Sequence, residues 1–168
     1  MTSKFLKLER QGFRHGTSDH QCPEFFYSMS ELGLCAMREF GYKVEKNTDK
    51  CAVDCFFPDG KSCEIKVDFR AGCDLPGKPH TGNLFIEVVS FGKPSRSIID
   101  NSDYLAEIFE HEGYTFVGLI ERSKFDYKNY PLHKVEYLGT EGHLVPVVDY
   151  LTMCDPDNIR CLPCTPPI

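Results

Sequence analysis

Asp54, Glu64 and Lys66 interrupt the apolar runs of the stretch VDCFFPDGKSCEIKVD (53–68), which otherwise has the pattern of a β-hairpin. Asp54 lies in the first apolar run, Glu64 and Lys66 lie in the second, and a Pro-Asp-Gly turn separates the runs. A core hairpin normally excludes acids, because a carboxylate that is desolvated without a partner costs several kcal/mol. We therefore treat these three residues as candidates for chemistry. A solvent-facing, salt-bridged hairpin is the alternative interpretation.

The spacing of the hairpin residues brings the charged groups together. Side chains alternate between the two faces of a strand, so the polar residues share one face: Ser62, Glu64, Lys66 and Asp68. Pairing across the turn places Asp54 close to Glu64, and two such carboxylates raise each other's pKa unless a cation lies between them. Oxygen ligands with open positions favour Mg²⁺ or Mn²⁺, which polarises phosphorus and lowers the pKa of a bound water. With a lysine to orient that water, the set fits phosphodiester hydrolysis.

The hairpin also resembles a known group of enzymes. Asp54, nine residues, then Glu64-x-Lys66, on a hairpin after a helix, is similar to the PD-(D/E)XK nuclease superfamily, and DCFFPDGKSCEIK is especially similar to the hairpin of phage-encoded junction-resolving endonucleases. The resemblance covers about residues 23–121. It implies a restriction-endonuclease-like α/β (α+β) core of helix, three-stranded meander, helix and strand, with a mixed central β-sheet flanked by helices. Val53 stands where many members have proline.

The same resemblance implies roles for individual residues. The implied ligands of a magnesium or manganese ion are Asp54, Glu64 and the carbonyl of Ile65. Lys66 would act at the attacking water. Many members add a carboxylate from the first helix, for which we expect Glu31, with Glu24 as the alternative. The implied activity is that of a metal-dependent DNA endonuclease.

Positive charge is concentrated in the first part of the chain. Residues 1–96 carry 14 Lys+Arg and 13 Asp+Glu, whereas residues 97–168 carry 5 and 12, within a net charge of −6. A DNA partner should therefore meet the first part. The candidate phosphate contacts, from the loop near 70–83 and the segment KPSRS (93–97), are Arg70, Lys78, Asn83, Lys93, Ser95 and Arg96. Plain turns and an ordinary helix N-cap would explain the same residues.

Further acids and the cysteines leave alternatives open. Glu87, in LFIEVVS, is either a partly buried acid or an additional ligand, and Asp68 is expected to pair with Arg70. Nine scattered cysteines are interpreted as mostly reduced thiols. A zinc site at the C-terminal cysteines is the weaker alternative, because no fourth ligand is evident for Cys154, Cys161 and Cys164.

Periodicity and turn residues predict the elements that would position these groups. An N-terminal arm (1–22) precedes a helix at about 23–40 and three strands, YKVEK, CAVDCFF and KSCEIKVDF. NLFIEVVSF is expected in the middle of a sheet. PSRSIIDNSDYLAEIFEHEG is expected to form a second helix, followed by a strand at YTFVGLIER. The C-terminal extension (122–168) predicts one or two edge strands and irregular structure.

Length and composition bound the class of protein. With 168 residues, we expect one nuclease-like domain at 23–168. The sequence has no window of 18 apolar residues and no signal-peptide pattern at its N-terminus, so we expect no membrane partner and a cytoplasmic location, in the host cytoplasm if the source is viral. A homodimer that cuts two strands is left open. The alternative function, favoured by the negative net charge, is a catalytically inactive nuclease-fold protein that acts as a binding or inhibitory module.

Overall fold

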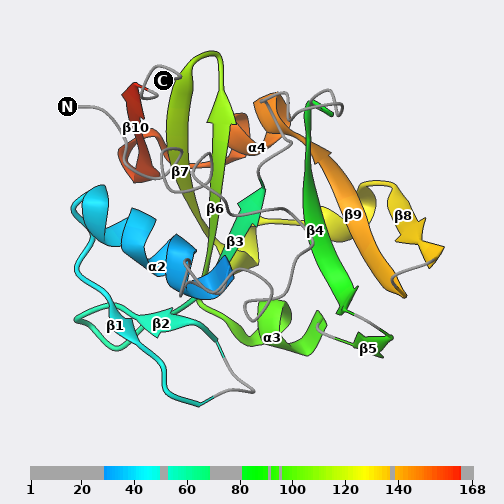
Figure 1. The fold of residues 1–168 in the computed structure, drawn as a ribbon, viewed down its shortest axis with the longest axis horizontal. Coiled ribbons are helices and arrows are strands. Elements are labelled where there is room, and N and C mark those ends of the chain that lie inside the picture. Colours follow the sequence, from blue (N-terminus) through cyan, green and yellow to red (C-terminus); the bar gives the residue numbers. More distant parts are fainter. Residues whose placement is uncertain are drawn as a thin grey trace, which may run out of the picture.

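The protein combines two β-sheets with a few helices (Figure 1). The computed structural model describes residues 29–49, 53–68, 81–90, 92–94, 96–136 and 139–163, with the backbone alone for 29–32, 90 and 96–98. The six-stranded sheet contains, in spatial order, β1 (Glu45–Lys46), β2 (Cys55–Phe56), β3 (Ser62–Asp68), β6 (Tyr104–His111), β7 (Tyr114–Glu121) and β10 (Ile159–Pro163). The four-stranded sheet contains β5 (Lys93–Pro94), β4 (Asn83–Ser90), β9 (Thr140–Pro146) and β8 (Leu132–Val135). The predicted α/β class with a mixed central sheet is confirmed at this level.

Helices and short 3-10 turns connect the strands. The α-helices are α2 (Met29–Glu39), α3 (Arg96–Asn101) and α4 (Val147–Met153). The 3-10 turns are η2 (Arg122–Lys124), η3 (Tyr127–Asn129) and η5 (Pro156–Asn158). None of the helices among the described residues has the length and apolar character needed to cross a membrane.

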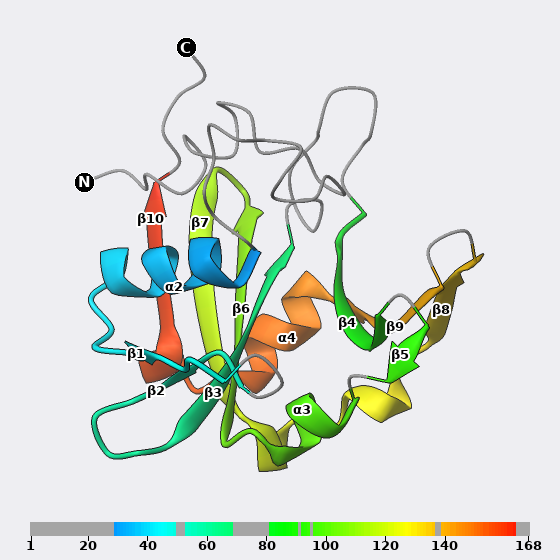
Figure 2. The ribbon, with the colours of Figure 1, turned by 60° about the horizontal axis from the view of Figure 1, so that its bottom comes forward.

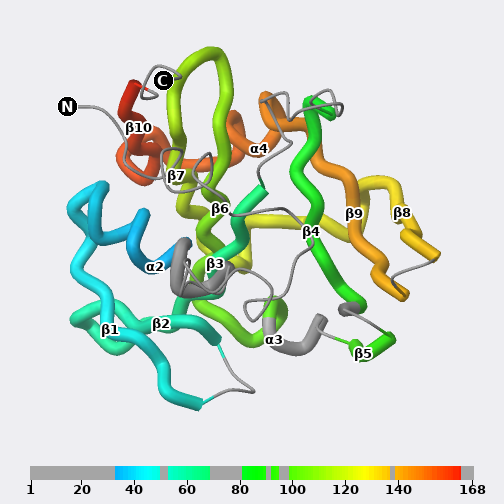
Figure 3. The backbone as a smooth tube through the Cα atoms, viewed as in Figure 1, coloured from blue at the N-terminus to red at the C-terminus, as the bar shows by residue number. Residues whose placement is uncertain are grey.

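The central sheet is mixed because of one pairing. Strands β1, β2 and β3 form an antiparallel meander, in which Cys55 is the Cα partner of Cys63. β3 then pairs with β6 in parallel, so that Lys66 is the Cα partner of Glu107. β7 and β10 continue the sheet by antiparallel pairing. Figure 3 shows the C-terminal strand, in red, beside β7, so the C-terminal extension contributes a strand to the central sheet.

One face of the central sheet packs on α2. Leu34, Met37 and Phe40 recur at helical spacing and are buried against Ile65 and Ile108. Gly41, with a φ of +88°, ends the helix, a backbone conformation that glycine adopts without a steric penalty. The guanidinium of Arg160 on β10 donates to the Phe40 carbonyl at 2.8 Å and stacks on Tyr42, with 3.9 Å to the ring centroid. These contacts hold the end of the helix to the edge strand β10 of the central sheet.

The opposite face of the sheet packs on α4 and the second sheet, as Figure 2 shows for α2 and α4 on the two sides of the strands. Leu105 and Phe109 of β6 belong to this second core, together with Leu84 and Ile86 of β4. Tyr150 of α4 donates a hydrogen bond to the Gly118 carbonyl at 2.8 Å. Strand β6 is therefore buried on both faces.

A charged cluster fixes the short helix α3 ahead of β6. Asp100 accepts hydrogen bonds from Arg122 at 2.6 Å, from the Tyr127 hydroxyl at 2.7 Å and from Lys128 at 3.1 Å. Burial opposes ionisation of Asp100, but these three donors outweigh it and lower its pKa to about 2. The cluster joins α3 to η2 and η3.

Three predictions about the elements had different outcomes. The segment expected to form a long second helix is helical only over Arg96–Asn101, and Tyr104–His111 is strand β6. The prediction that NLFIEVVSF lies in the middle of a sheet is confirmed, because β4 is an inner strand of the second sheet, between β5 and β9. The C-terminal extension was expected to form one or two edge strands and irregular structure. β8 and β10 are edge strands, but the extension also forms the inner strand β9 and the helix α4.

The closest approach of α2 to β3 depends on Gly33. A Cβ atom at this position would overlap the Cγ2 of Ile65 and lie 3.3 Å from the Cγ2 of Val67. Ile65 is 4% exposed and β-branched, so its side chain has little freedom to move. We expect Gly33→Ala to destabilise the protein by about 1–2 kcal/mol, despite the gain of about 1 kcal/mol in helix propensity. Thermal unfolding should show a lowered Tm.

A double-mutant cycle tests this cause. Ile65→Ala removes the methyl group that a Cβ at position 33 would meet, so the Tm decrease caused by Gly33→Ala should shrink when it is introduced together with Ile65→Ala. An equal decrease in both backgrounds would contradict the overlap as the cause.

Candidate active site

The predicted hairpin residues meet where β2 and β3 leave their short pairing. Cys55 pairs with Cys63, so extending the register by one residue places Asp54 opposite Glu64. The backbone N–H of Ile65 donates to Asp54 Oδ2 at 2.8 Å and fixes the carboxyl group. Asp54 itself is half-buried. The predicted convergence of Asp54 and Glu64 is confirmed.

Glu64 is a buried acid with one paired and one unpaired oxygen. The residue is 6% exposed. Its Oε1 lies 3.1 Å from the Nζ of Lys66, whereas its Oε2 is buried and finds no hydrogen-bond partner among the described residues. The neighbouring carboxyl group is that of Asp54, which interacts with Glu64 electrostatically. The oxygens of two ionised carboxyl groups can only accept hydrogen bonds. A proton or a cation between Asp54 and Glu64 is therefore needed for a favourable interaction between them.

Burial and mutual repulsion control the charges of this pair. Burial raises the pKa of Glu64 to about 7, with Asp54 contributing to the rise and Lys66 opposing it. Burial also raises the pKa of Asp54, against the hydrogen bond from Ile65 and the charge of Lys66. The pair therefore holds a proton more readily than two exposed carboxyl groups would.

Lys66 lies among carboxyl groups. Burial alone would lower its pKa, but Glu64 and then Glu87 raise it above the ordinary value, with a further contribution from Asp54. The side chain is 21% exposed, so part of it reaches the surface. Lys66 is therefore a cation at neutral pH that reaches the surface of an acidic site.

Strand β4 reaches this site from the second sheet. Asp68, at the end of β3, accepts a hydrogen bond from the backbone N–H of Phe85 at 2.9 Å, which joins the two sheets. Glu87 follows Phe85 by two residues on the same face of β4 and interacts with Lys66. The structure thus brings Glu87 to the predicted site. Asp68 was expected to pair with Arg70, which lies outside the described residues, and its described partner is Phe85.

Other predicted residues are placed less completely. Glu31 belongs to α2, but only its backbone is described. Glu24 and the N-terminal arm lie outside the described residues. Ile65 contributes its backbone N–H to Asp54 and its side chain to the core with α2. The predicted DNA contacts that lie outside the described residues are Arg70, Lys78 and Ser95, and only the backbone is described for Arg96.

The remaining predicted DNA contacts have definite places. Asn83 begins β4, and its Nδ2 donates to the Thr81 carbonyl at 3.1 Å, so its side chain closes the turn before the strand. Lys93 is exposed on β5. Of the C-terminal cysteines, Cys154 is buried and its pKa is raised to about 12 by burial, whereas Cys161 is exposed. Cys164 lies outside the described residues.

Glu107 is a buried acid that was not among the residues predicted from sequence. This residue is 0% exposed, and both of its carboxyl oxygens are buried without a hydrogen-bond partner among the described groups. Burial raises its pKa well above the ordinary value, with Asp68 and Glu64 adding to the rise and Lys66 opposing it. The available signal was a single acid inside the apolar run YLAEIF, the same pattern that marks Glu64 in SCEIKV.

The donor set is small but suited to a divalent ion. Within the described ranges, no three His, Cys, Asp or Glu side chains are grouped so that they could hold a metal ion. Asp54 and Glu64 provide two carboxyl groups, and the unpaired Glu64 Oε2 is a buried oxygen for which a divalent cation would be a partner. The observed residues therefore fit a Mg²⁺ or Mn²⁺ ion that keeps several waters.

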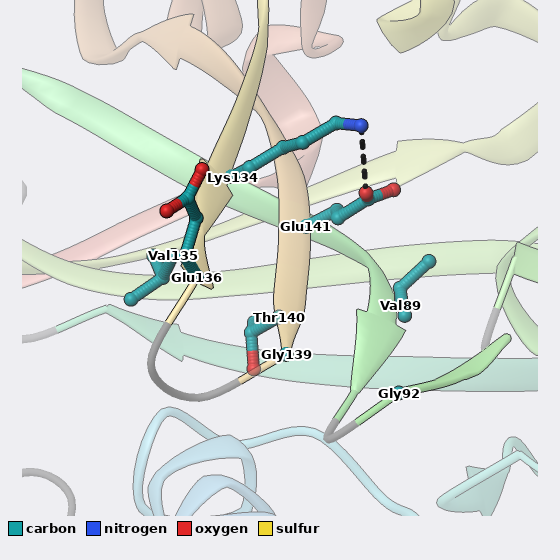
Figure 4. A pocket seen from close by; sticks show the side chains of 8 residues that line it. All are labelled: Val89, Gly92, Lys134, Val135, Glu136, Gly139, Thr140 and Glu141. Atoms are coloured by element: carbon teal, nitrogen blue, oxygen red, sulfur yellow. Dashed lines mark ion pairs between the residues drawn. The ribbon is translucent and has the colours of Figure 1, made fainter.

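A shallow pocket at the second sheet is separate from these residues. It lies between the ends of β4, β8 and β9 and is lined by Val89, Gly92, Lys134, Val135, Glu136, Gly139, Thr140 and Glu141 (Figure 4). Lys134 and Glu141 form an ion pair across it at 3.2 Å. The lining does not include Asp54, Glu64 or Lys66.

Comparison with known proteins adds no assignment: no family model matches the sequence, and no curated protein matches it.

The raised pKa of Glu64 predicts how stability depends on pH without metal. The folded protein holds this proton more tightly than the unfolded chain, in which the pKa is near 4.5. The stabilisation is complete below about pH 4.5 and is lost as the pH rises through about 7, by at most about 3 kcal/mol. Urea unfolding at pH 4.5 to 8 in EDTA should show this decrease in wild type and a flatter profile in Glu64→Gln. Glu141→Gln, in the exposed ion pair, should keep the wild-type profile, and identical profiles for Glu64→Gln and wild type would exclude this cause.

Proposed function

We propose that the protein is a metal-dependent DNA endonuclease that hydrolyses phosphodiester bonds at Asp54, Glu64 and Lys66. The observation that carries the proposal is the buried Glu64, which interacts with the carboxyl group of the half-buried Asp54, pairs with Lys66 through Oε1 and leaves Oε2 without a hydrogen-bond partner among the described residues. A core built for stability alone would place apolar residues there. A site that binds a divalent ion gives both acids a partner.

The residues of the proposed site have different roles in metal binding and hydrolysis. Asp54, Glu64 and the carbonyl of Ile65 would hold a Mg²⁺ or Mn²⁺ ion. When bound, that ion supplies charge stabilisation at phosphorus and acidifies a bound water. The hydrogen bond from Ile65 N–H keeps the Asp54 carboxyl group oriented toward Glu64. Lys66 donates hydrogen bonds from its ammonium group, which orients a water or offsets the negative charge that develops on phosphate oxygens.

The reaction that this arrangement supports is a simple hydrolysis. The oxygen of a water molecule forms a bond to phosphorus, and the bond from phosphorus to one sugar oxygen breaks. The water proton leaves to solvent, and the leaving sugar oxygen takes up a proton. One new strand end carries a phosphate and the other carries a hydroxyl group.

The fold supports the same proposal. The order α2, β1–β2–β3 meander, α3 and then β6 parallel to β3 is compatible with the helix, meander, helix and strand of the PD-(D/E)XK nucleases, including the phage enzymes that the hairpin resembles. In this comparison β4 and β5 are an insertion between the meander and α3. The greater share of positive charge in residues 1–96 supports DNA as the partner.

A cleavage assay tests the proposal directly. Supercoiled, linear and four-way-junction DNA are incubated with the protein in Mg²⁺, Mn²⁺ or EDTA. We expect metal-dependent nicking that falls at least about a thousandfold in Lys66→Ala and Asp54→Asn, because each removes a group that acts in the transition state. Circular dichroism should show that both variants are folded.

Lys134→Ala is the matched control, because Lys134 is also an ion-paired lysine on a strand but lies at the pocket of the second sheet. It should cut DNA at the wild-type rate. Binding of DNA without cleavage under every metal condition would overturn the endonuclease proposal. It would favour the catalytically inactive binding module, which the net charge of −6 also favours.

Metal binding can be measured without DNA. A divalent ion that binds the folded protein raises its Tm, by an amount set by concentration and affinity. We expect Mn²⁺ at millimolar concentration to raise the Tm of wild type at pH 8, and the increase to disappear in Asp54→Asn/Glu64→Gln. The increase should be smaller at pH 6, because a proton then competes at Glu64, whose pKa is about 7. The same Tm increase in the double variant would place the bound metal elsewhere.

A further inference from the structure

Glu107 has no role in the proposed function as described so far, although it lies next to the lysine. It stands in the middle of β6, where the parallel register makes it the Cα partner of Lys66. Paired residues on adjacent strands project to the same face of a sheet, so the two side chains leave the sheet side by side. Lys66 reaches the surface with 21% of its side chain exposed, whereas Glu107 is fully buried. Glu107 therefore lies beneath the lysine.

The environment of Glu107 is unfavourable for an acid. Its face of β6 also carries Leu105 and Phe109, both 0% exposed and part of the second core. Both oxygens of Glu107 are buried without a hydrogen-bond partner among the described residues. An unpaired polar group in such a place costs free energy, and a leucine would pack there without this cost.

The groups that face Glu107 are known from both sides. β3 presents Lys66, Asp68 and Glu64, and α4 with its C-cap presents Tyr150 and Cys154. The Tyr150 hydroxyl donates to the Gly118 carbonyl at 2.8 Å. Among these groups Lys66 is the cation, so it is the group that a carboxyl at position 107 attracts.

We propose that Glu107 is a positioning residue that holds the side chain of Lys66 in the site from beneath. A lysine side chain has four rotatable bonds and loses about 2 kcal/mol of rotamer entropy when it is fixed. Among the described residues its close partner is Glu64 Oε1 at 3.1 Å, and Glu64 is also a proposed metal ligand. A second acid on the neighbouring strand restrains Lys66 when Glu64 is engaged elsewhere. A fully buried residue does not touch DNA, so Glu107 acts through Lys66.

This inference rests on the proposed function for its purpose, but the electrostatic attraction between Glu107 and Lys66 can be tested without cleavage. The measurement is a double-mutant cycle by thermal unfolding with Glu107→Leu, Lys66→Met and the double variant. We expect Glu107→Leu to raise the Tm by about 2–4 °C, because it removes an unpaired buried carboxyl group. The rise should be larger in the Lys66→Met background, where the acid has lost its cation. Equal rises in both backgrounds would overturn the proposal.

Cleavage gives the second readout. Glu107→Leu should lower kcat about tenfold or more and leave KM for DNA unchanged, because the lysine acts on the reacting group and not on binding. Glu107→Gln keeps the shape and one acceptor oxygen, so it should recover part of the lost kcat. If Glu107→Leu does not fold, Glu107→Gln replaces it in the cycle, with the same non-additivity expected.

Glu110 offers a matched control on the same strand. It is 9% exposed and its Oε2 is also buried without a partner among the described groups, but the alternation of β6 places it on the face opposite to Glu107. Glu110→Leu should be additive with Lys66→Met and should keep the wild-type kcat. Equal losses of kcat in the Glu107 and Glu110 variants would overturn the positioning role. A wild type that does not cleave DNA would instead refute the proposed function, and the unfolding cycle would still decide whether Glu107 attracts Lys66.

Discussion

Two carboxyl groups that lie side by side in a mostly buried place are the constraint on which the site depends. Asp54 and Glu64 cannot both be negatively charged there unless positive charge lies close, and Lys66 reaches only one oxygen of Glu64. The short β2–β3 pairing and the hydrogen bond from Ile65 to Asp54 keep the two groups together. The pair therefore needs a bound proton or a bound metal ion. Because the pKa of Glu64 is about 7, a metal ion can replace the proton at physiological pH.

The excess of carboxyl groups over cations at the site also determines the conditions under which an anionic substrate could bind. The carboxyl groups that interact at the site are Asp54, Glu64, Asp68, Glu87 and Glu107, against the single cation Lys66 among the described groups that face them. Such a cluster repels phosphate until it is neutralised, so metal binding and substrate binding should depend on each other. The second sheet takes part in this balance, because the hydrogen bond from Phe85 to Asp68 joins β4 to β3 and Glu87 of β4 interacts electrostatically with Lys66.

The hairpin was predictable from sequence because its signals are local. A Pro-Asp-Gly turn and strict alternation in 62–68 determined which side chains share a face, and Cys63 and Ile65 are buried on the other face as expected. β6 was not predictable in this way. It is buried on both faces, so its apolar residues do not alternate, and their spacing also fits a helix. Glu107 then resembled the polar side of a helix. The place of β4 depends on β9, which comes from a distant part of the chain and carries no local signal of that pairing.

β3 and β6 show how one pair of strands serves stability and chemistry at once. On the face toward α2 they carry Cys63, Ile65, Ala106 and Ile108, all buried and apolar. On the other face the same strands carry the site acids and Lys66 between apolar residues. Because the side-chain period is two, a slip of one residue would bury the charges under α2 and move Ile65 into the site. The apolar packing of α2 at Gly33 therefore fixes the register, and the register fixes the chemistry. The unpaired Glu107 is tolerable in this fold because apolar packing between α2 and the opposite face of β3 and β6 offsets the free energy that its burial costs.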